Sequence, residues 1–230
     1  MKYTIGHGGN MSNIKKINDA LFSIQSKVKE TKERDKLDVS IGNSKLGSNT
    51  LIINMGTALD CPSAKLGMCN AVKNGAKCYA LKAEIQYKES TTDYRHRQFS
   101  YWRESTGTKI ANDIIQKIAQ KTSGTIKYVR FNEAGDFWDQ DDIKKLSIVA
   151  KKLKNFGIVT YGYTARRDLD YSKAEFLVKG SGHKKGNNGM TTIISKNQEV
   201  PDSFKLCPGS CKSCSLCMSN KKINIAFRKH

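Results

Sequence analysis

Four cysteines near the carboxyl end of the chain form its densest group of chemically active side chains. They are Cys207, Cys211, Cys214 and Cys217, in the run CPGSCKSCSLC. Thiolates at such short intervals allow one segment to wrap a single metal centre, as ferredoxin-type loops do around iron–sulfur clusters. Tetrahedral zinc is the alternative, but zinc sites more often join two separated cysteine pairs. The spacing therefore favours a [4Fe-4S] cluster over zinc.

Three further cysteines, Cys61, Cys69 and Cys78, follow a short apolar run at 51–55 that is typical of a buried strand. Loops at the carboxyl ends of parallel strands converge on ligand sites in α/β folds. We expect these three thiols to hold a second cluster with one open iron, and the four downstream thiols to hold a closed cluster. The alternative is one cluster that takes ligands from both groups, with the remaining thiols structural.

Polar residues follow two later apolar runs, at 126–131 and 158–163, and predict an active site at the same edge. The expected catalytic residues are Arg130, Glu133, Asp136 and Arg166, and the expected cofactor-binding residues are Asn132 and Tyr163. The two arginines would hold an anionic small-molecule substrate, since a guanidinium pairs well with carboxylate or phosphate. Glu133 or Asp136 would transfer protons, in redox or radical chemistry at or near a cluster.

Strand-like and helix-like runs alternate along the chain at the spacing of βαβ units, which predicts an α/β fold with mostly parallel strands. Strands are expected at 51–55, 126–131, 158–163, 176–178, 191–195 and 223–227, and helices at 80–89, 92–104, around 110–118 and around 143–153. Five to seven strands are too few for a complete eightfold barrel. The pattern predicts a partial or distorted β/α barrel, or an open sheet, that carries cysteine-rich metal-binding loops.

The organisation predicts a single α/β domain over residues 1–230, because no linker or internal repeat interrupts it. An amphipathic pattern indicates an N-terminal helix within 1–36, and residues 207–217 form the C-terminal cysteine segment. The Gly, Asn and Lys-rich stretch 180–189 predicts a mobile loop.

The chain is strongly basic, with 40 Lys plus Arg against 21 Asp plus Glu and a net charge of +19. Most of the excess is Lys scattered along the whole length, which predicts weak, nonspecific binding of nucleic acid rather than a dedicated interface. Residues 93–103 mix Arg with aromatic side chains, as base stacking requires, although a helix that packs its aromatics in the core explains the same pattern. A zinc-stabilised nucleic-acid-binding protein is accordingly the alternative function.

Cellular location is predicted from what the sequence lacks. There is no run of about 20 apolar residues that would span a membrane, and residues 1–10 lack the apolar run of a signal peptide. We therefore expect a cytoplasmic protein. Its seven cysteines then point to metal rather than disulfides, because cytosolic reductants keep thiols free.

The order of these sequence features resembles that of phage-encoded proteins labelled gene product 88. The matching features lie between Leu51 and Met218, and the first fifty residues carry no match. They are Cys61-Pro62, Cys69, Cys78-Tyr79-Ala80, Arg130, Gly135-Asp136-Phe137, Tyr163-Thr164-Ala165-Arg166, and Cys207-Pro208 with Cys211, Cys214 and Cys217. The resemblance implies a phage origin, a place in the cytoplasm of the infected host cell, and a cysteine-bound cluster on a barrel-like α/β fold.

A looser likeness is to radical enzymes that cleave S-adenosylmethionine, in which a three-cysteine loop follows the first strand of a partial barrel. Those enzymes space their cysteines Cys-x3-Cys-x2-Cys, whereas Cys61, Cys69 and Cys78 are much farther apart. The likeness is an analogy of architecture, and we infer no use of S-adenosylmethionine from it.

Overall fold

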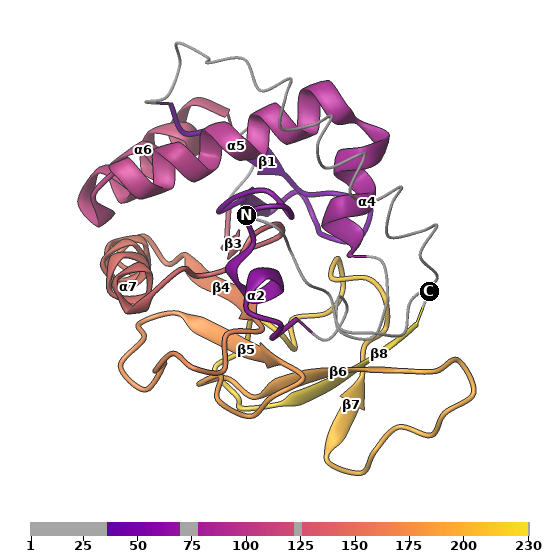
Figure 1. Cartoon of the computed structure of the whole chain (residues 1–230). Coiled ribbons are helices and arrows are strands. Elements are labelled where there is room, and N and C mark those ends of the chain that lie inside the picture. The colour runs from indigo at the N-terminus through magenta and orange to yellow at the C-terminus, as the bar shows by residue number, and fades with distance from the viewer. Residues whose placement is uncertain (1–35, 70–77, 122–125, 230) are drawn as a thin grey trace.

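A computed structural model of the chain describes residues 36–69, 78–121 and 126–229 (Figure 1). The N-terminal helix expected within 1–36 falls almost entirely outside these residues. Within them, no helix is long and apolar enough to cross a membrane.

The described residues build one eight-stranded sheet, in the order β1-β2-β3-β4-β5-β6-β8-β7. The strands are β1 (Ser40–Ile41), β2 (Thr50–Ile53), β3 (Tyr128–Phe131), β4 (Val159–Thr164), β5 (Leu177–Ser181), β6 (Met190–Ile194), β7 (Phe204–Leu206) and β8 (Asn224–Arg228). Only the pair β1–β2 is antiparallel, so the prediction of a mostly parallel α/β sheet is confirmed. Its edges are β1 and β7.

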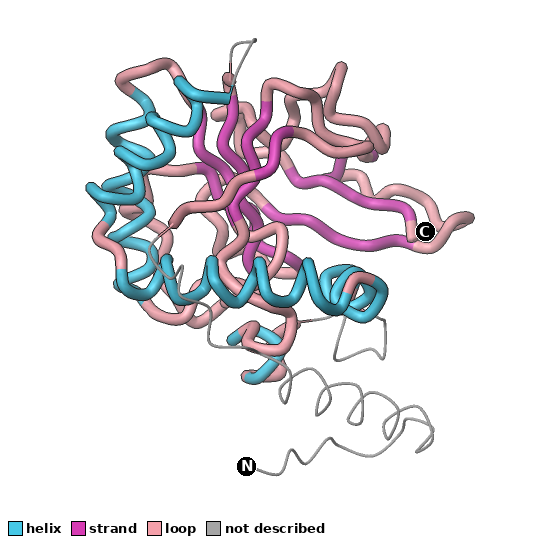
Figure 2. The backbone as a smooth tube through the Cα atoms, turned by 90° about the horizontal axis from the view of Figure 1, so that it is seen from above, coloured by secondary structure: helices cyan, strands magenta, loops and turns pink. Residues whose placement is uncertain are grey.

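Five helices are described: α2 (Pro62–Lys65), α4 (Tyr79–Gln86), α5 (Lys88–Glu104), α6 (Gly107–Lys121) and α7 (Gln140–Lys154). Figure 2 shows the helices gathered along two sides of the strands, with loops and the C-terminal strands on the other side. The side chain of Asp139 caps α7 by accepting a hydrogen bond from the amide of Asp142 at 3.0 Å. The cap fixes the start of α7 directly after the polar turn that follows β3.

The two faces of the sheet have different partners, because side chains alternate along each strand. On one face, Leu51, Ile53, Val129 and Phe131 pack against apolar residues of α5, α6 and α7 in the main core. Arg130 lies on the opposite face, where it is the register partner of Tyr161 on β4. We call this opposite face the inner face.

The C-terminal cysteine segment covers part of the inner face. Tyr161 belongs to a second, smaller core cluster together with Cys217, Met218 and Ile225. Tyr128, Tyr163 and Leu177 pack against the same cluster. The segment is therefore held against the sheet by aromatic and aliphatic contacts.

Helix α5, which mixes Arg with aromatic residues, packs against the main core. Tyr101 and Trp102 of α5 are buried in the main core. Arg95 is also buried, and its Nη1 lies 2.8 Å from Glu84 Oε1. Arg103 lies 3.3 Å from Asp142. The contacts therefore favour the explanation that α5 packs aromatic residues in the core, over the explanation that it stacks nucleic-acid bases.

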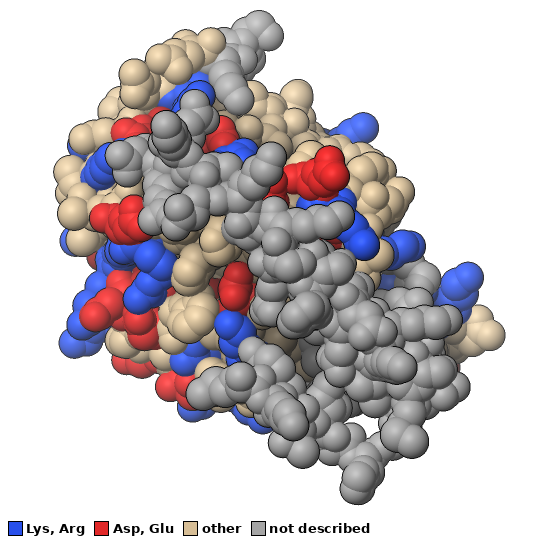
Figure 3. Space-filling view, turned by 45° about the horizontal axis from the view of Figure 1, so that its top comes forward, with Lys and Arg blue, Asp and Glu red and all other residues tan. Residues whose placement is uncertain are grey.

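The charges on the described surface that Figure 3 leaves visible are of both signs. There, Lys and Arg side chains are interspersed with Asp and Glu. This mixture agrees with the scattered positions of Lys in the sequence.

The loop at 180–189 is packed more closely than a mobile loop would be. The amide of Gly180 donates to the carbonyl of Gly189 at 3.0 Å, and the amide of Asn188 donates to Val178 at 3.0 Å. Gly186, Asn188 and Gly189 are buried. Backbone hydrogen bonds thus hold this loop against β5.

Candidate metal centre and adjoining polar site

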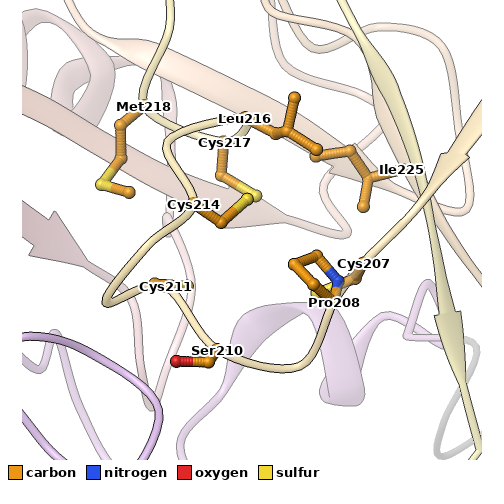
Figure 4. Close-up of a pocket in the computed structure, with 9 residues that line it drawn as sticks. All are labelled: Cys207, Pro208, Ser210, Cys211, Cys214, Leu216, Cys217, Met218 and Ile225. Atoms are coloured by element: carbon orange, nitrogen blue, oxygen red, sulfur yellow. The ribbon is translucent and has the colours of Figure 1, made fainter.

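The four C-terminal cysteines all line one pocket (Figure 4). Its other lining residues are Pro208, Ser210, Leu216, Met218 and Ile225. The thiols are free, and Figure 4 shows the side chains of Cys214 and Cys217 turned toward each other. Within the described part of the chain, no three His, Cys, Asp or Glu side chains already stand at metal-binding distances. Coordination at this pocket would therefore draw the thiols together.

Backbone hydrogen bonds anchor the cysteine segment at two places. The amide of Cys207 donates to the carbonyl of Ala226 on β8 at 2.9 Å, and the amide of Cys211 donates to Lys45 at 2.8 Å. Between them, the amide of Gly209 donates to the sulfur of Cys207 at 3.5 Å. Amide donors that point at sulfur are a feature of loops that hold metal–thiolate centres.

Burial governs the acidity of the thiols in this pocket. Burial raises the pKa of Cys217 to about 11, although the hydroxyl of Tyr163 and the ammonium of Lys179 act in the opposite direction. Burial also raises the pKa of Cys211. Without a metal, these thiols are therefore protonated at neutral pH, and metal binding would have to displace the protons.

The other three cysteines lie around the loop that follows β2. Cys61 immediately precedes α2 and Cys78 immediately precedes α4. The amide of Cys69 donates to the carbonyl of Ser63 at 3.0 Å, which folds the chain back onto the start of α2. Cys69 influences the acidity of both Cys61 and Cys78, so the three thiols are electrostatic neighbours.

Burial, together with the nearby carboxylate of Asp136, raises the pKa of Cys61 to about 12. The amides of Ser63 and Ala64, in the first turn of α2, oppose this shift by favouring the thiolate. This group thus has the same requirement as the C-terminal one: a cation must stabilise the thiolates.

Asp136 joins the three-cysteine loop to the ends of two strands. Its Oδ2 accepts hydrogen bonds from Ser63 Oγ at 2.5 Å and from the amide of Ala165 at 2.9 Å. Its Oδ1 accepts from Thr164 Oγ1 at 2.7 Å and from the amide of Phe137 at 2.8 Å. The carboxyl group is buried, and burial raises its pKa while these donors oppose the rise. Asp136 is thus well placed to fix the relative positions of the loop, β3 and β4.

Arg166 makes its hydrogen bonds within the protein. Its Nε and Nη2 each donate to Asp168 at 2.8 Å. Its Nη1 donates to the carbonyl oxygens of Phe137 at 2.6 Å and Trp138 at 2.7 Å. A guanidinium with these partners holds the two strand ends together and has little capacity left for a substrate anion.

Arg130 has a different environment on the inner face. Its guanidinium lies over the ring of Tyr163, 5.4 Å from the ring centroid, and its Nη1 is 3.8 Å from Glu133 Oε1. Glu133 also accepts a hydrogen bond from Asn43 Nδ2 at 3.0 Å. Arg130 influences the acidity of Cys211, which places it beside the C-terminal cysteine segment.

Three buried polar atoms near Arg130 have no hydrogen-bond partner in the described structure. They are Nε of Arg130 itself, the hydroxyl of Tyr161 and Oδ1 of Asn132. Asn132 also has a positive φ of 59°, a backbone conformation that residues other than glycine seldom adopt. Buried polar atoms are usually hydrogen-bonded, so these three have hydrogen-bonding capacity that the described residues do not use.

The structure therefore divides the predicted site into two connected parts. Asp136 lies with the three-cysteine loop, and Arg130 with Tyr163 lies beside the four-cysteine segment. Two functional candidates escaped the sequence analysis. Tyr161 was hidden among the aromatic residues of its strand, and Lys179 had one available signal, a lysine directly after an apolar run.

Fold and site together define a mixed α/β protein with two cysteine groups and a polar site between them. The family model described as Gene product 88 matches residues 20–178, and the chain belongs to this family. No curated protein and no solved structure matches the chain.

The extent of the family match corrects the range expected from the resemblance. The match begins at residue 20, so part of the first fifty residues belongs to it. It ends at residue 178, so the C-terminal cysteine segment lies beyond it. The likeness to radical enzymes gains no support from these comparisons.

Proposed function

We propose that this protein is an iron–sulfur protein that binds a [4Fe-4S] cluster through Cys207, Cys211, Cys214 and Cys217. The observation that carries the proposal is that all four thiols line a single pocket. Four thiolates are the usual ligand set of such a cluster. The segment is fixed at Cys207 and Cys211 by backbone hydrogen bonds, and the four cysteines lie within eleven consecutive residues.

The walls of the pocket fit a cluster rather than a hydrated ion. Leu216, Met218 and Ile225 supply apolar surface, and Met218 and Ile225 are buried. An apolar lining limits access of water to the iron and tunes its reduction potential. Zinc bound by the same four thiolates is the competing centre.

The second part of the proposal concerns Cys61, Cys69 and Cys78, which would hold a further cluster with one open iron. The influence of Cys69 on the acidity of Cys61 and Cys78, and the position of the three cysteines around a loop that follows a parallel strand, support this assignment. In the rival arrangement a single cluster takes ligands from both cysteine groups.

The third part is a site for an anionic small molecule on the inner face. Arg130 Nε and the hydroxyl of Tyr161 are donors without a partner, and the two residues are register neighbours on β3 and β4. A carboxylate or phosphate oxygen between them would satisfy both donors. Glu133, 3.8 Å from Arg130, is the candidate for proton transfer, with Asn132 and Tyr163 as neighbouring contacts.

The reaction in this proposal is redox or radical chemistry at or near a cluster. Arg166 and Asp136 would act by positioning, since their polar groups already have protein partners. The architecture in this proposal is a partial β/α barrel. It is supported by the sequential parallel order from β2 to β6 and by the contact of the cysteine segment with Lys45, close to the other end of the sheet.

Spectroscopy of cysteine variants tests this proposal. The protein is reconstituted with iron and sulfide without oxygen, and its visible absorption and its electron paramagnetic resonance after reduction are recorded. We expect Cys211→Ala and Cys214→Ala to remove one cluster signal, and the triple variant of Cys61, Cys69 and Cys78 to remove another. Ser213→Ala, in the same segment, is the matched control and should change neither signal.

The outcomes separate the parts of the proposal. If the triple variant keeps every signal, the three-cysteine site is not a cluster. If both sets of variants abolish the same single signal, one shared cluster replaces two. If no variant changes any signal, the cysteines do not bind iron and the proposal fails.

A further inference from the structure

Lys179 is a buried cation on β5, with 1% of its surface exposed. Its Nζ donates hydrogen bonds to the carbonyl oxygens of Asn188 at 2.5 Å and Ile223 at 2.7 Å. Among the described residues, no carboxylate lies within ion-pair distance of it. Buried lysines are rare unless an anion is paired with them, because burial penalises an uncompensated charge. The environment of Lys179 therefore lacks an anion.

Cys217 is a neighbour of Lys179 that could become negative. Asn188, whose carbonyl accepts from Lys179, donates through its Nδ2 to the carbonyl of Cys217 at 3.4 Å. Tyr163, the register partner of Lys179 on β4, has its hydroxyl against the Cys217 thiol. Burial lowers the pKa of Lys179, and a negative charge at Cys217 acts in the opposite direction. Lys179 is thus linked to this one cysteine by hydrogen bonds, by packing and by charge.

We propose that Lys179 is the buried counter-charge of a negatively charged tetrathiolate centre at Cys207, Cys211, Cys214 and Cys217. The inference rests on the proposed function and assigns a residue that tunes the centre. Four thiolates around iron–sulfur or zinc carry a net negative charge, which a fixed ammonium offsets in a medium of low dielectric constant. Lys179 is a positioning and tuning residue, because its contact with the ligands runs through Asn188 and Tyr163.

The charge has a direct consequence for a cluster. When dithionite supplies one electron, the cluster gains one negative charge and the reductant is oxidised. A nearby cation stabilises the reduced form more than the oxidised form, and so raises the reduction potential. Removal of the cation must therefore make the cluster harder to reduce.

The test compares Lys179→Gln, which retains a hydrogen-bond donor without the charge, with Lys179→Arg, which retains the charge. Lys173→Gln, at an exposed lysine before the same strand, is the matched control. The midpoint potential of the reconstituted protein is measured by dithionite titration. We expect Lys179→Gln to lower the equilibrium constant for reduction at least tenfold, a shift of about 59 mV toward negative potential. Lys179→Arg should recover most of it.

A second measurement separates charge from folding and also covers a zinc centre. The metal-free forms are unfolded by urea, and the rate of metal release to a chelator is measured for the loaded forms. The inference is supported, for either metal, if Lys179→Gln releases metal faster than Lys179→Arg does. The difference in release rate must exceed what the difference in stability between the two metal-free variants explains. A merely structural lysine would change the urea midpoint and leave the potential and the relative release rate unchanged.

The failures are distinguishable. If Cys217→Ala removes the centre while Lys179→Gln leaves the potential and release rate at the wild-type values, this inference is overturned and the proposed function stands. If the cysteine variants leave metal content unchanged, or if the protein holds no metal, both are overturned.

Discussion

The amide of Cys211 donates a hydrogen bond to the carbonyl of Lys45 at 2.8 Å. This contact joins the cysteine segment, which precedes the last strand, to the turn between the first two strands. A second anchor holds the start of the segment, where the amide of Cys207 donates to Ala226 on β8. The cysteine segment therefore contacts two parts of the sheet that are far apart, the β1–β2 turn and β8.

The turn after β3 depends on Gly135. Its φ is +80°, and a Cβ atom there would lie 2.9 Å from the amide nitrogen of Gly56 and 3.0 Å from the carbonyl carbon of Met55. We expect Gly135→Ala to lower the free energy of unfolding by about 3 kcal/mol, because backbone strain and a steric clash add. Gly67→Ala is the control, with a φ of +65° and open space around it. It should cost about 1 kcal/mol in urea unfolding. If both variants lost the same free energy of unfolding, the close approach of residue 135 to Gly56 would not contribute to the cost.

We expect Asp136 to stabilise the folded state through its hydrogen bonds, in addition to lying near the Cys61 thiol. Asp136→Asn places an NH2 group among donors that now point at a carboxylate, which we expect to cost about 3 kcal/mol. Asp141→Asn, at an exposed aspartate of α7, should leave the urea midpoint unchanged. An Asp136→Asn protein as stable as wild type would mean that the hydrogen bonds from Ser63 and Thr164 contribute little.

Asp60, which immediately precedes Cys61, gives a prediction for acid pH. Interaction with His96 is the largest cause that lowers the pKa of Asp60, to about 2. A carboxyl with a lowered pKa in the folded state stabilises the protein above its ordinary value of 3.8, and this stabilisation is lost as pH falls toward 2. About a third of the side chain is exposed, so water screens the effect and we expect about 1 kcal/mol. Wild type and Asp60→Asn should therefore differ in urea unfolding at pH 5 and converge as the pH falls to about 2. A difference that grows with acid would reverse the assigned sign.

The scattered lysines predict weak, nonspecific binding of nucleic acid. Affinity for a labelled DNA duplex, measured by fluorescence anisotropy, should fall steeply between low and physiological salt, because phosphate contacts release counterions. Two duplexes of unrelated sequence should behave alike. Tight, selective binding that persists at physiological salt would favour the alternative, a zinc-stabilised nucleic-acid-binding protein.

Much of the sheet could be predicted because its central strands are apolar runs. β2, β3 and β4 lie within two residues of their expected bounds. Each of these strands buries side chains, and burial requires the apolar residues that made the strands visible in the sequence. β1 and β7 could not be predicted, because strands of two and three residues at the sheet edges carry no hydrophobic pattern. The single turn of α2 was missed for the same reason: four residues are too few for a helical period.

The hydrogen-bond partners of the candidate site residues could not be predicted from the sequence. That Arg130 and Arg166 would approach the same edge follows from the parallel pairing expected for their two strands. Only the folded structure shows that Phe137 and Trp138 supply carbonyl acceptors for Arg166, while Nε of Arg130 has none. For Lys179 the sequence offered only its position directly after an apolar run, because its burial without a carboxylate partner is visible only in the folded structure.

The central claim, a cluster at the C-terminal cysteines, is tested most directly by metal and sulfide analysis of the full chain purified without oxygen. The account predicts a brown protein that contains about four iron and four acid-labile sulfide per occupied site. It also predicts that this content is lost when Cys207, Cys211, Cys214 and Cys217 are replaced together by Ala. A colourless protein with stoichiometric zinc, and no sulfide after anaerobic reconstitution, would contradict it.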